Sequence, residues 1–546
     1  MSRLFRPSTV ALISGALVLV AGALLWRPFA EPYGRHAVLS SLPAGDMEIA
    51  WLNAATNNVA WERLVAAAHR LQADRPELEM HQVRDANAFP SQTTQVPEFV
   101  LDFGGRPRLW FRWYKLTADL GPTEWVQAFA ERNPPPVAVI GGGSSDRARD
   151  LARSLKEQQP RFRPSAPLLL ITTATADLVD DDQELIAIYQ QSFRFCFTNS
   201  QMAEAVADFI WMQEDLRPDG APLYMALWDD DPYSEDLFKQ FHRVLGPDGF
   251  YRSFRPEETL QSIAKDWAWL AGRLSTGGIP TGMEMEGLRR GEYQSRPVSG
   301  QFVHIPYSVG TYTQPNRWEV GASEIILNQL TQHPDQRRPL LVLPAGPQPA
   351  RRLLRALLRA APQDASRFIV ATGDAIDFNT IYRDRNLAWP IQDLPVPLVL
   401  FCHRNPVDPR GFEPLEGNEP PDARQRTSTG TQDLLLYRDI LETLAKAVYD
   451  GKGTAQDSSD LGDKLRHQPR PTETTSRFDH KGNLESGSGE FVVCLRPVRA
   501  ADRVLPQARL QVWNRLTNAD GARHWQQVPV AGQPELLVGY SSASEN

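Results

Sequence analysis

Cysteine is scarce in this sequence. Only Cys196, Cys402 and Cys494 occur among 546 residues, they lie far apart, and none belongs to a C-x-x-C pair or to a Cys/His set with the spacing of a zinc site. A disulfide framework and a structural zinc centre are therefore excluded as the basis of the fold. Cys402 precedes His403, but neighbouring residues on a strand point to opposite faces, so we expect Cys402 to be a core residue.

Concentrated basic charge is also lacking. The chain has 58 Lys and Arg against 66 Asp and Glu, which gives a net charge of -8 and an isoelectric point near 5.8. Phosphate backbones bind to clusters of Lys and Arg, so we expect no nucleic-acid partner. Hydrophobic residues make up 42% and charged residues 23% of the chain, a balance typical of a water-soluble globular body.

The sequence lacks the short motifs of the common catalytic and nucleotide-binding sites. It has no G-x-x-x-x-G-K-[ST] phosphate loop, no G-x-S-x-G nucleophile elbow and no H-E-x-x-H helix, and the glycines at 141–143 fail the G-x-G-x-x-G spacing. Its ten histidines form no evident cluster. We therefore expect no cofactor, no metal and no enzymatic activity.

Long apolar runs are absent except for one at the start of the chain. Residues 10–26 contain no charged side chain. This length is at the lower edge for a membrane-spanning helix, the tryptophan at its end suits a membrane interface, and no small-x-small cleavage site follows. We therefore predict a transmembrane signal anchor at 10–28, with the body on the extracytoplasmic (periplasmic) side of the cell membrane. A cleaved signal peptide is the alternative.

From residue 47 the apolar pattern alternates between short strands and amphipathic helices. MEIAWLNA, VAWERLVAAAHRLQAD and LEMHQVRD give a β-α-β opening, and the rhythm restarts at APLYMALWDD. We predict an α/β protein with two lobes, each a mostly parallel sheet flanked by helices. The predicted boundaries are 1–9 for a tail, 29–46 for a linker, 47–214 plus part of 431–500 for the first lobe, 221–402 for the second lobe with an insertion at 257–301, 403–430 for a surface loop, 451–476 for a polar loop and 501–546 for a C-terminal extension.

The loops that follow the strands hold the candidate site residues, because a ligand of an open α/β sheet binds beyond the carboxyl ends of the strands. One such loop is the glycine run at 141–143, followed by Ser144 and Ser145. Glycines let the backbone approach a ligand, and the next helix offers free N–H groups and a positive dipole end, which suits a carboxylate. The alternative is a tight turn in which Ser144 only caps the helix.

Three further strand ends carry polar side chains. Thr173 and Thr175 follow the strand APLLLI and offer hydroxyl groups to a polar solute, although β-branched residues also favour strands for their own sake. Tyr233 follows an acidic turn at 229–231, and its ring could stack on a ligand. Asp374 follows the strand RFIVATG and is the candidate partner for an ammonium group, with helix capping as the alternative.

Taken in order, these segments resemble the branched-chain-amino-acid-binding (Leu/Ile/Val-binding-like) family of ABC transporter solute-binding proteins. VAVIGGGSSDRARDLA resembles the family's strand, glycine-serine loop and helix, and PLLLITTATADLV resembles its strand that ends in hydroxyl residues. FRFCFTNSQMAEAVADFI resembles its Phe-Arg strand and helix, and YMALWDDDPYSEDLFKQF the start of its second lobe. The likeness spans most of residues 47–497. It implies a two-lobed type I periplasmic-binding fold, preceded here by one N-terminal transmembrane helix.

The resemblance also implies roles in the cleft between the lobes. Hydroxyl groups would hold a ligand carboxylate, an aromatic ring would close over the ligand, and a carboxylate would face its amino group. Two departures from the family concern the ligand: the Gly-Pro before its serine is Gly-Gly here, and the hydroxyl loop is one residue shorter. The corresponding residues are Ser144 or Ser145 with Thr173 or Thr175, then Tyr233, and then Asp374.

The sequence thus predicts an extracytoplasmic, membrane-tethered solute-binding protein. It would take an amino acid or a similar small polar solute in the interlobe cleft and serve an ABC transporter permease. Two other interpretations stay open. A sensor or a structural surface protein would carry a degenerate cleft, and an α/β enzyme would need a paired nucleophile and base there, which the sequence does not show.

Overall fold

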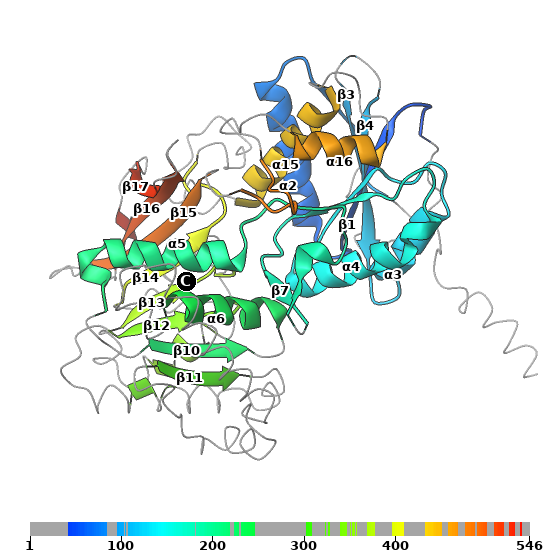
Figure 1. Cartoon of the computed structure of the whole chain (residues 1–546). Coiled ribbons are helices and arrows are strands. Elements are labelled where there is room, and N and C mark those ends of the chain that lie inside the picture. Colours follow the sequence, from blue (N-terminus) through cyan, green and yellow to red (C-terminus); the bar gives the residue numbers. More distant parts are fainter. Residues whose placement is uncertain are drawn as a thin grey trace, which may run out of the picture.

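Two β-sheets, each with its own helices, form two lobes in the computed structural model (Figure 1). The predicted anchor at 10–28, the insertion at 257–301 and most of the loop at 403–430 lie outside the described residues. No helix within the described part of the chain is both long enough and apolar enough to cross a membrane. The described residues are 42–84, 96–102, 104, 107–180, 182–218, 223–228, 231–245, 302–307, 323, 326–327, 339–346, 350, 352–354, 356–357, 368–376, 396–408, 432–449, 457–467, 476–485, 489–498, 507–517, 523–529 and 535–537.

The first lobe is built on a seven-stranded sheet in the order β2-β3-β4-β1-β5-β6-β9. Its strands from β4 to β9 are parallel neighbours, whereas β2 and β3 form an antiparallel edge that the sequence analysis does not anticipate. Strands β5 and β6 are buried along their whole length because helices cover both faces of the sheet. The bounds are β1 Met47–Ala54, β2 Glu79–Arg84, β3 Glu98–Asp102, β4 Leu109–Leu116, β5 Ala138–Gly141, β6 Leu168–Ile171 and β9 Ser192–Arg194.

Five helices cover this sheet. On one face α2, α15 and α16 share a core with Trp51, Trp61 and Trp113, and on the other face α3 and α4 pack over the alternate side chains of the same strands. Helices α15 and α16 come from beyond the parallel strands of the second lobe, as predicted for part of 431–500. The bounds are α2 Asn58–Asp74, α3 Pro122–Ala130, α4 Ser145–Gln158, α15 Gln432–Tyr449 and α16 Ser458–Arg466.

The second lobe has a nine-stranded sheet in the order β11-β10-β12-β13-β14-β15-β16-β17, with β18 paired to β16. The first five of these strands are parallel, as predicted, and the C-terminal strands from β15 onward are antiparallel. The residues predicted as a C-terminal extension at 501–546 thus contribute strands to this sheet. The bounds are β10 Leu223–Trp228, β11 Phe302–Tyr307, β12 Leu340–Leu343, β13 Ile369–Thr372, β14 Leu398–Cys402, β15 Glu490–Val498, β16 Gln507–Thr517, β17 Arg523–Val528 and β18 Glu535–Leu537.

Helices α5 (Asn199–Met212) and α6 (Pro232–Leu245) cover one face of the second sheet and share its core (Figure 1). The expected boundary of the first lobe at residue 214 differs from this arrangement, because α5 packs with the second lobe. Its start is fixed by Thr198, whose hydroxyl accepts from the backbone N–H of Gln201 while the Gln201 side chain accepts from the Thr198 N–H.

The predicted polar loop at 451–476 contains α16, so that prediction is wrong in part. Asp457 caps the helix by accepting from the N–H of Asp460, and Leu461 and Leu465, four residues apart, are buried against the first lobe. Two buried leucines are too few to stand out in an otherwise polar segment. The remaining short elements are η1 Gln159–Arg161, β7 Leu178–Val179, β8 Gln183–Glu184, η2 Leu185–Ala187 and η3 Glu214–Leu216.

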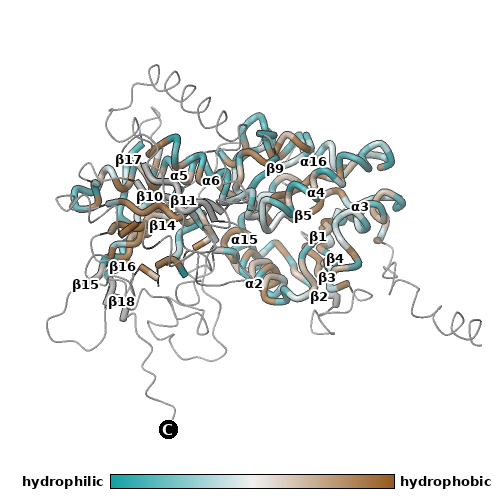
Figure 2. Tube along the Cα trace, turned by 90° about the horizontal axis from the view of Figure 1, so that it is seen from below, coloured by the Kyte–Doolittle hydropathy of each residue, from teal (hydrophilic) through white to brown (hydrophobic). Residues whose placement is uncertain are grey.

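The chain passes between the lobes at three places in its described part: from β9 to α5, from β14 toward α15, and from residues 476–485 to β15. These passages lie next to one another, because Phe195 O accepts from Arg404 and the Arg194 N–H donates to Gly482 O. Figure 2 shows the two lobes from below, with hydrophobic residues along β14. The passages therefore form a hinge region at the base of the interlobe space.

Candidate functional site

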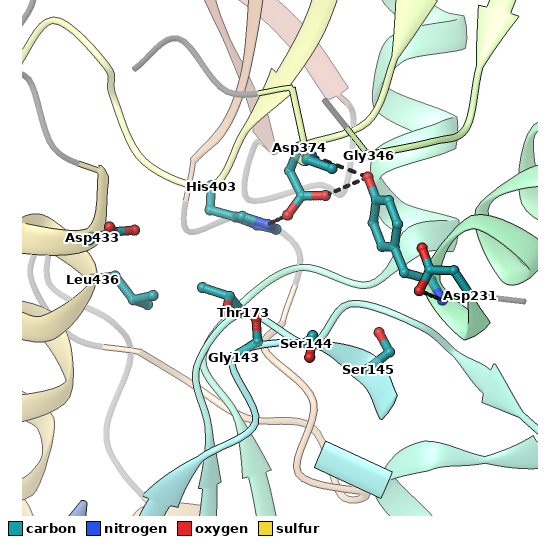
Figure 3. Close-up of a pocket in the computed structure, with 12 residues that line it drawn as sticks. Gly143, Ser144, Ser145, Thr173, Asp231, Gly346, Asp374, His403, Asp433 and Leu436 are labelled. Atoms are coloured by element: carbon teal, nitrogen blue, oxygen red, sulfur yellow. Dashed lines mark hydrogen bonds and ion pairs between the residues drawn. The ribbon is translucent and has the colours of Figure 1, made fainter. Parts of the chain in front are cut away.

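A cavity of about 330 Å³ lies between the lobes. The first lobe contributes the loop after β5, the loop after β6 and one face of α15, and the second lobe contributes the start of α6 and the ends of β12, β13 and β14 (Figure 3). This volume is at the small end of the range of roughly 300–1,000 Å³ for small-molecule sites. The lining residues are Gly143, Ser144, Ser145, Thr173, Asp231, Tyr233, Gly346, Asp374, Ala375, His403, Asp433 and Leu436.

The two serines of the first lobe line the cavity but differ in what they contact. Ser144 occupies the cap position of α4, yet its side chain makes no capping hydrogen bond, so the alternative of a pure helix cap is not what the geometry shows. Ser145 is 1% exposed, and its hydroxyl oxygen accepts from the Ala176 N–H at 3.3 Å. Both hydroxyl protons are thus free of any capping bond and can be donated to an anionic ligand group.

The two predicted threonines lie in different surroundings. Thr173 lines the cavity, and its hydroxyl donates to Gly143 O at 3.1 Å, so toward a ligand this oxygen can act only as an acceptor. Thr175 is fully buried and is not among the lining residues. Its hydroxyl oxygen has no hydrogen-bond partner among the described residues. The structure therefore brings Thr173 to the cavity and leaves Thr175 in the core behind it.

The second lobe presents an aromatic ring and a carboxylate. Asp231 caps α6 by accepting from the N–H groups of Tyr233 and Ser234 and from the Ser234 hydroxyl. Capping holds Tyr233 in the first turn, where its hydroxyl donates to Asp374 Oδ1 at 2.9 Å and accepts from the Ala375 N–H at 3.2 Å. Burial, reinforced by the charge of Asp374, holds the pKa of Tyr233 well above its usual value, so the phenol remains a donor.

His403 is a lining residue that the sequence analysis does not select. Its Nε2 lies 2.8 Å from Asp374 Oδ2, so both oxygens of that carboxylate have a donor, one from each side (Figure 3). Its neighbour Cys402 is fully buried, as expected for a core residue. The sequence does contain a signal for His403, because this residue directly follows a buried parallel strand. The same rule selects Asp374.

The cavity is acidic. Three carboxylates line it, those of Asp231, Asp374 and Asp433, while its described lining contains no Lys or Arg. Asp433 on α15 is paired with Arg63 on α2, whereas the partners of Asp374 are a histidine and a phenol. Burial raises the pKa of Asp231 despite the hydrogen bonds that it accepts as a cap. The lining therefore favours a ligand group that is positively charged.

No protein-family model matches the sequence, and no curated protein matches it. Solved structures match in their fold. A leucine-binding protein from Thermotoga maritima is 12% identical, with 88% of this chain and 97% of that chain covered and a TM-score of 0.45. A binding protein for leucine, isoleucine, valine, threonine and alanine from Brucella ovis is 9% identical, with 91% and 96% covered and a TM-score of 0.47.

An ABC transporter solute-binding protein from Rhodopseudomonas palustris, in complex with 3,4-dihydroxybenzoic acid, is 9% identical, with 85% of this chain and 95% of that chain covered and a TM-score of 0.46. The matching structures are type I periplasmic binding proteins. They are of the kind that the sequence resembles.

Proposed function

We propose that this protein is an extracytoplasmic, membrane-tethered solute-binding protein, which takes an amino acid or a similar small polar solute between its lobes for an ABC transporter permease. One observation carries the proposal. Side chains predicted separately from four strand-end loops line a single cavity of ligand size, with both lobes contributing. Closure of such lobes about a hinge is a general way to enclose a ligand. The apolar run at 10–26 supports the membrane tether.

The polarity of the two walls suits a zwitterion. On the first-lobe wall, Ser144 and Ser145 offer hydroxyl protons beside the N-terminus of α4, where a carboxylate is stabilised. On the opposite wall, Asp374 offers a negative charge, and Thr173 of the first lobe, which lies below it in Figure 3, offers an acceptor oxygen for an ammonium group. Leu436 adds an apolar surface on α15. An aromatic acid without an amino group would leave the Asp374 charge without a ligand cation.

A catalytic role has less support from the same residues. A nucleophile in this cavity would need a base within hydrogen-bond reach, and the histidine in the described lining is His403. Both of its ring nitrogens already have partners, the Phe197 N–H and Asp374, and neither partner is a serine or threonine hydroxyl. The arrangement holds a carboxylate in place rather than activating a hydroxyl.

Thermal unfolding of the full-length chain tests the proposal with four probes: leucine, two analogues that each lack one of its charged groups, and one aromatic acid. L-leucine carries both charges, 4-methylpentanoate lacks the amine, 3-methylbutylamine lacks the carboxylate, and 4-hydroxybenzoate is an aromatic acid. We expect leucine to raise the unfolding temperature most, because a ligand at about 100 times its Kd stabilises by roughly 2.7 kcal/mol. If none of the four probes and none of the other L-amino acids shifts the transition, the sensor or structural interpretation replaces this one.

Asp374→Ala should weaken leucine binding by about 1–3 kcal/mol, the cost of removing a charged hydrogen-bond partner. Titration calorimetry measures the change. The matched control is Asp150→Ala, which removes an exposed carboxylate of α4 that pairs only with Arg149 and lies outside the cavity. Equal affinities of both variants and the wild-type chain would remove Asp374 from the binding site.

A further inference from the structure

His403 stands where the second lobe meets the hinge, and both of its ring nitrogens are engaged. It directly follows β14, at the start of the passage toward α15, and its side chain is 7% exposed. The backbone N–H of Phe197, in the passage from β9 to α5, donates to Nδ1 at 3.2 Å. Nε2 lies 2.8 Å from Asp374 Oδ2. The ring of Phe197 is also stacked on the imidazole, with 6.0 Å between centroids and an interplanar angle of 13°.

These contacts fix the form of the imidazole. A ring nitrogen that accepts a hydrogen bond carries no proton, so in the neutral form the proton of His403 is on Nε2 and is donated to Asp374. The Tyr233 hydroxyl donates to the other oxygen of this carboxylate at 2.9 Å. Two donors on two oxygens hold Asp374 in one orientation and leave its remaining lone pairs to the cavity that it lines.

The next residue extends the connection across the hinge. Arg404 donates to Asp439 on α15 of the first lobe, to Phe195 O in the passage from β9, and to His403 O. The side chains of Arg404 and Asp439 are 11% and 15% exposed. His403 thus contacts the passage from β9 to α5 directly and is connected to α15 of the first lobe through Arg404.

We propose that His403 is the positioning residue of the cleft: it donates to Asp374 through Nε2–H, sets that carboxylate for a ligand amino group, and ties it to the hinge. The proposal rests on the function proposed above, since it names the group of the ligand that the site selects. It predicts that the binding of amines depends on His403 and that the binding of the same acid without its amine does not.

Two amide variants separate the two contacts of His403. Glutamine reaches as far as Nε2 and keeps a donor for Asp374, whereas asparagine keeps an acceptor near Nδ1 for the Phe197 N–H and loses the donor. In titrations with the full-length chain, we expect His403→Asn to weaken L-leucine and 3-methylbutylamine about tenfold, and His403→Gln to stay within about threefold of wild type. Affinity for 4-methylpentanoate should change little in either variant. Equal losses in both variants, or equal losses for all three probes, would overturn the proposal.

If the wild-type chain binds none of the probes, a second measurement tests the contact between His403 and Asp374. That result defeats the proposed function, and the contact between His403 and Asp374 is then tested by unfolding temperatures of His403→Asn, Asp374→Ala and the double variant. If the two residues are coupled, the double variant loses clearly less than the sum of the single losses. Histidine-selective 15N spectra, assigned with His403→Gln, should show Nε2 protonated and Nδ1 bare at neutral pH. Additive losses, or a protonated Nδ1, would refute the positioning role.

Discussion

Two adjacent serines in the cleft illustrate how little separates a binding residue from a structural one. Ser144 and Ser145 both line the cavity, but only Ser145 is tied to the protein, through the Ala176 N–H. Ser144 stands at the cap position of α4 and leaves the cap unmade. The half-buried hydroxyl of Ser144 is available to a ligand at little cost, because no capping hydrogen bond must break.

The two serines should therefore respond differently to substitution. Ser144→Ala should weaken leucine binding by about 1 kcal/mol, the usual net value of a hydrogen bond, and leave the free energy of unfolding unchanged within about 0.5 kcal/mol. Ser145→Ala should lower the free energy of unfolding by about 1–3 kcal/mol, because the buried Ala176 N–H loses its acceptor. Urea unfolding and calorimetry on both variants check this. If both variants changed leucine affinity and the free energy of unfolding by the same amounts, the different contacts of the two serines would have no effect.

At the residue level, the strand-end rule recovers most of the lining but cannot resolve single positions. The carboxyl ends of parallel strands meet at one edge, so Tyr233 and Asp374 are predictable from sequence as neighbours in space. Whether Thr173 or Thr175 faces the ligand depends on the path of an irregular loop, which has no periodic pattern. The same rule could select His403, but its contact with a backbone N–H more than 200 positions earlier in the chain has no signal in the sequence.

Among the elements, the loop between β5 and α4 determines how closely a ligand approaches the first lobe. Gly142 has φ +74°, and a Cβ added there would lie 2.8 Å from the Cβ of Ala148 on α4. A Cβ added at Gly143, which lines the cavity, would meet no atom within 4 Å. The first glycine is thus required by the fold, and the second leaves room for the ligand.

Alanine at these two positions should separate folding from binding. Gly142→Ala should lower the free energy of unfolding by about 2–4 kcal/mol, the sum of a left-handed backbone penalty and an overpacked contact. Gly143→Ala should leave unfolding almost unchanged and weaken leucine binding, since its methyl group projects into open space at the cavity wall. Urea unfolding and calorimetry on both variants are the tests. A stable Gly142→Ala protein would contradict the geometry of the loop.

Helices and strands are predictable from the sequence where the hydrophobic pattern is strong. The prediction fails where tertiary contacts decide which sheet an element joins. The parallel strands β5, β6, β12 and β14 are short apolar runs, which identifies them in the sequence. The sequence pattern predicts helix α5 in the first lobe, whereas it packs on the second sheet, because its sequence does not specify which sheet its apolar face covers. Of the antiparallel strands, β15 pairs with β14, β16 pairs with β15, and β17 and β18 pair with β16, so their place depends on tertiary contacts.

At the scale of the whole molecule, the lobes touch outside the hinge as well. Asp236 of α6, in the second lobe, accepts from the N–H groups of Asp177 and Leu178 in the first, at 2.8 and 3.3 Å. Asn199 and Gln240 also donate to it. Burial, with the charge of Asp177 as the next cause, raises the pKa of Asp236 to about 7. An interlobe contact of this kind breaks when the lobes separate.

The sign of the pH effect follows from this shift. A folded-state pKa above the value of 3.8 for a free carboxyl means that the folded chain binds the proton more tightly. The stabilisation is complete below pH 4 and is lost as pH rises through 7, at roughly 1 kcal/mol per pH unit in between. Urea unfolding at pH 5, 6, 7 and 8 should show the advantage of the wild-type chain over Asp236→Asn shrinking with pH. Parallel pH profiles would show that Asp236 does not titrate in this window.

The return of α15 and α16 to the first lobe has a consequence for synthesis. Six leucines, isoleucines and valines of α15 belong to the same core as α2 and the tryptophans of the first sheet. When β9 leaves the ribosome, residues 195–431 have still to be made before that core can close. At typical rates of about 5–20 residues per second, this takes roughly 10–50 s. During that interval the part of this apolar face that α15 and α16 cover stays open, which offers a binding surface for holding chaperones until both helices are translated.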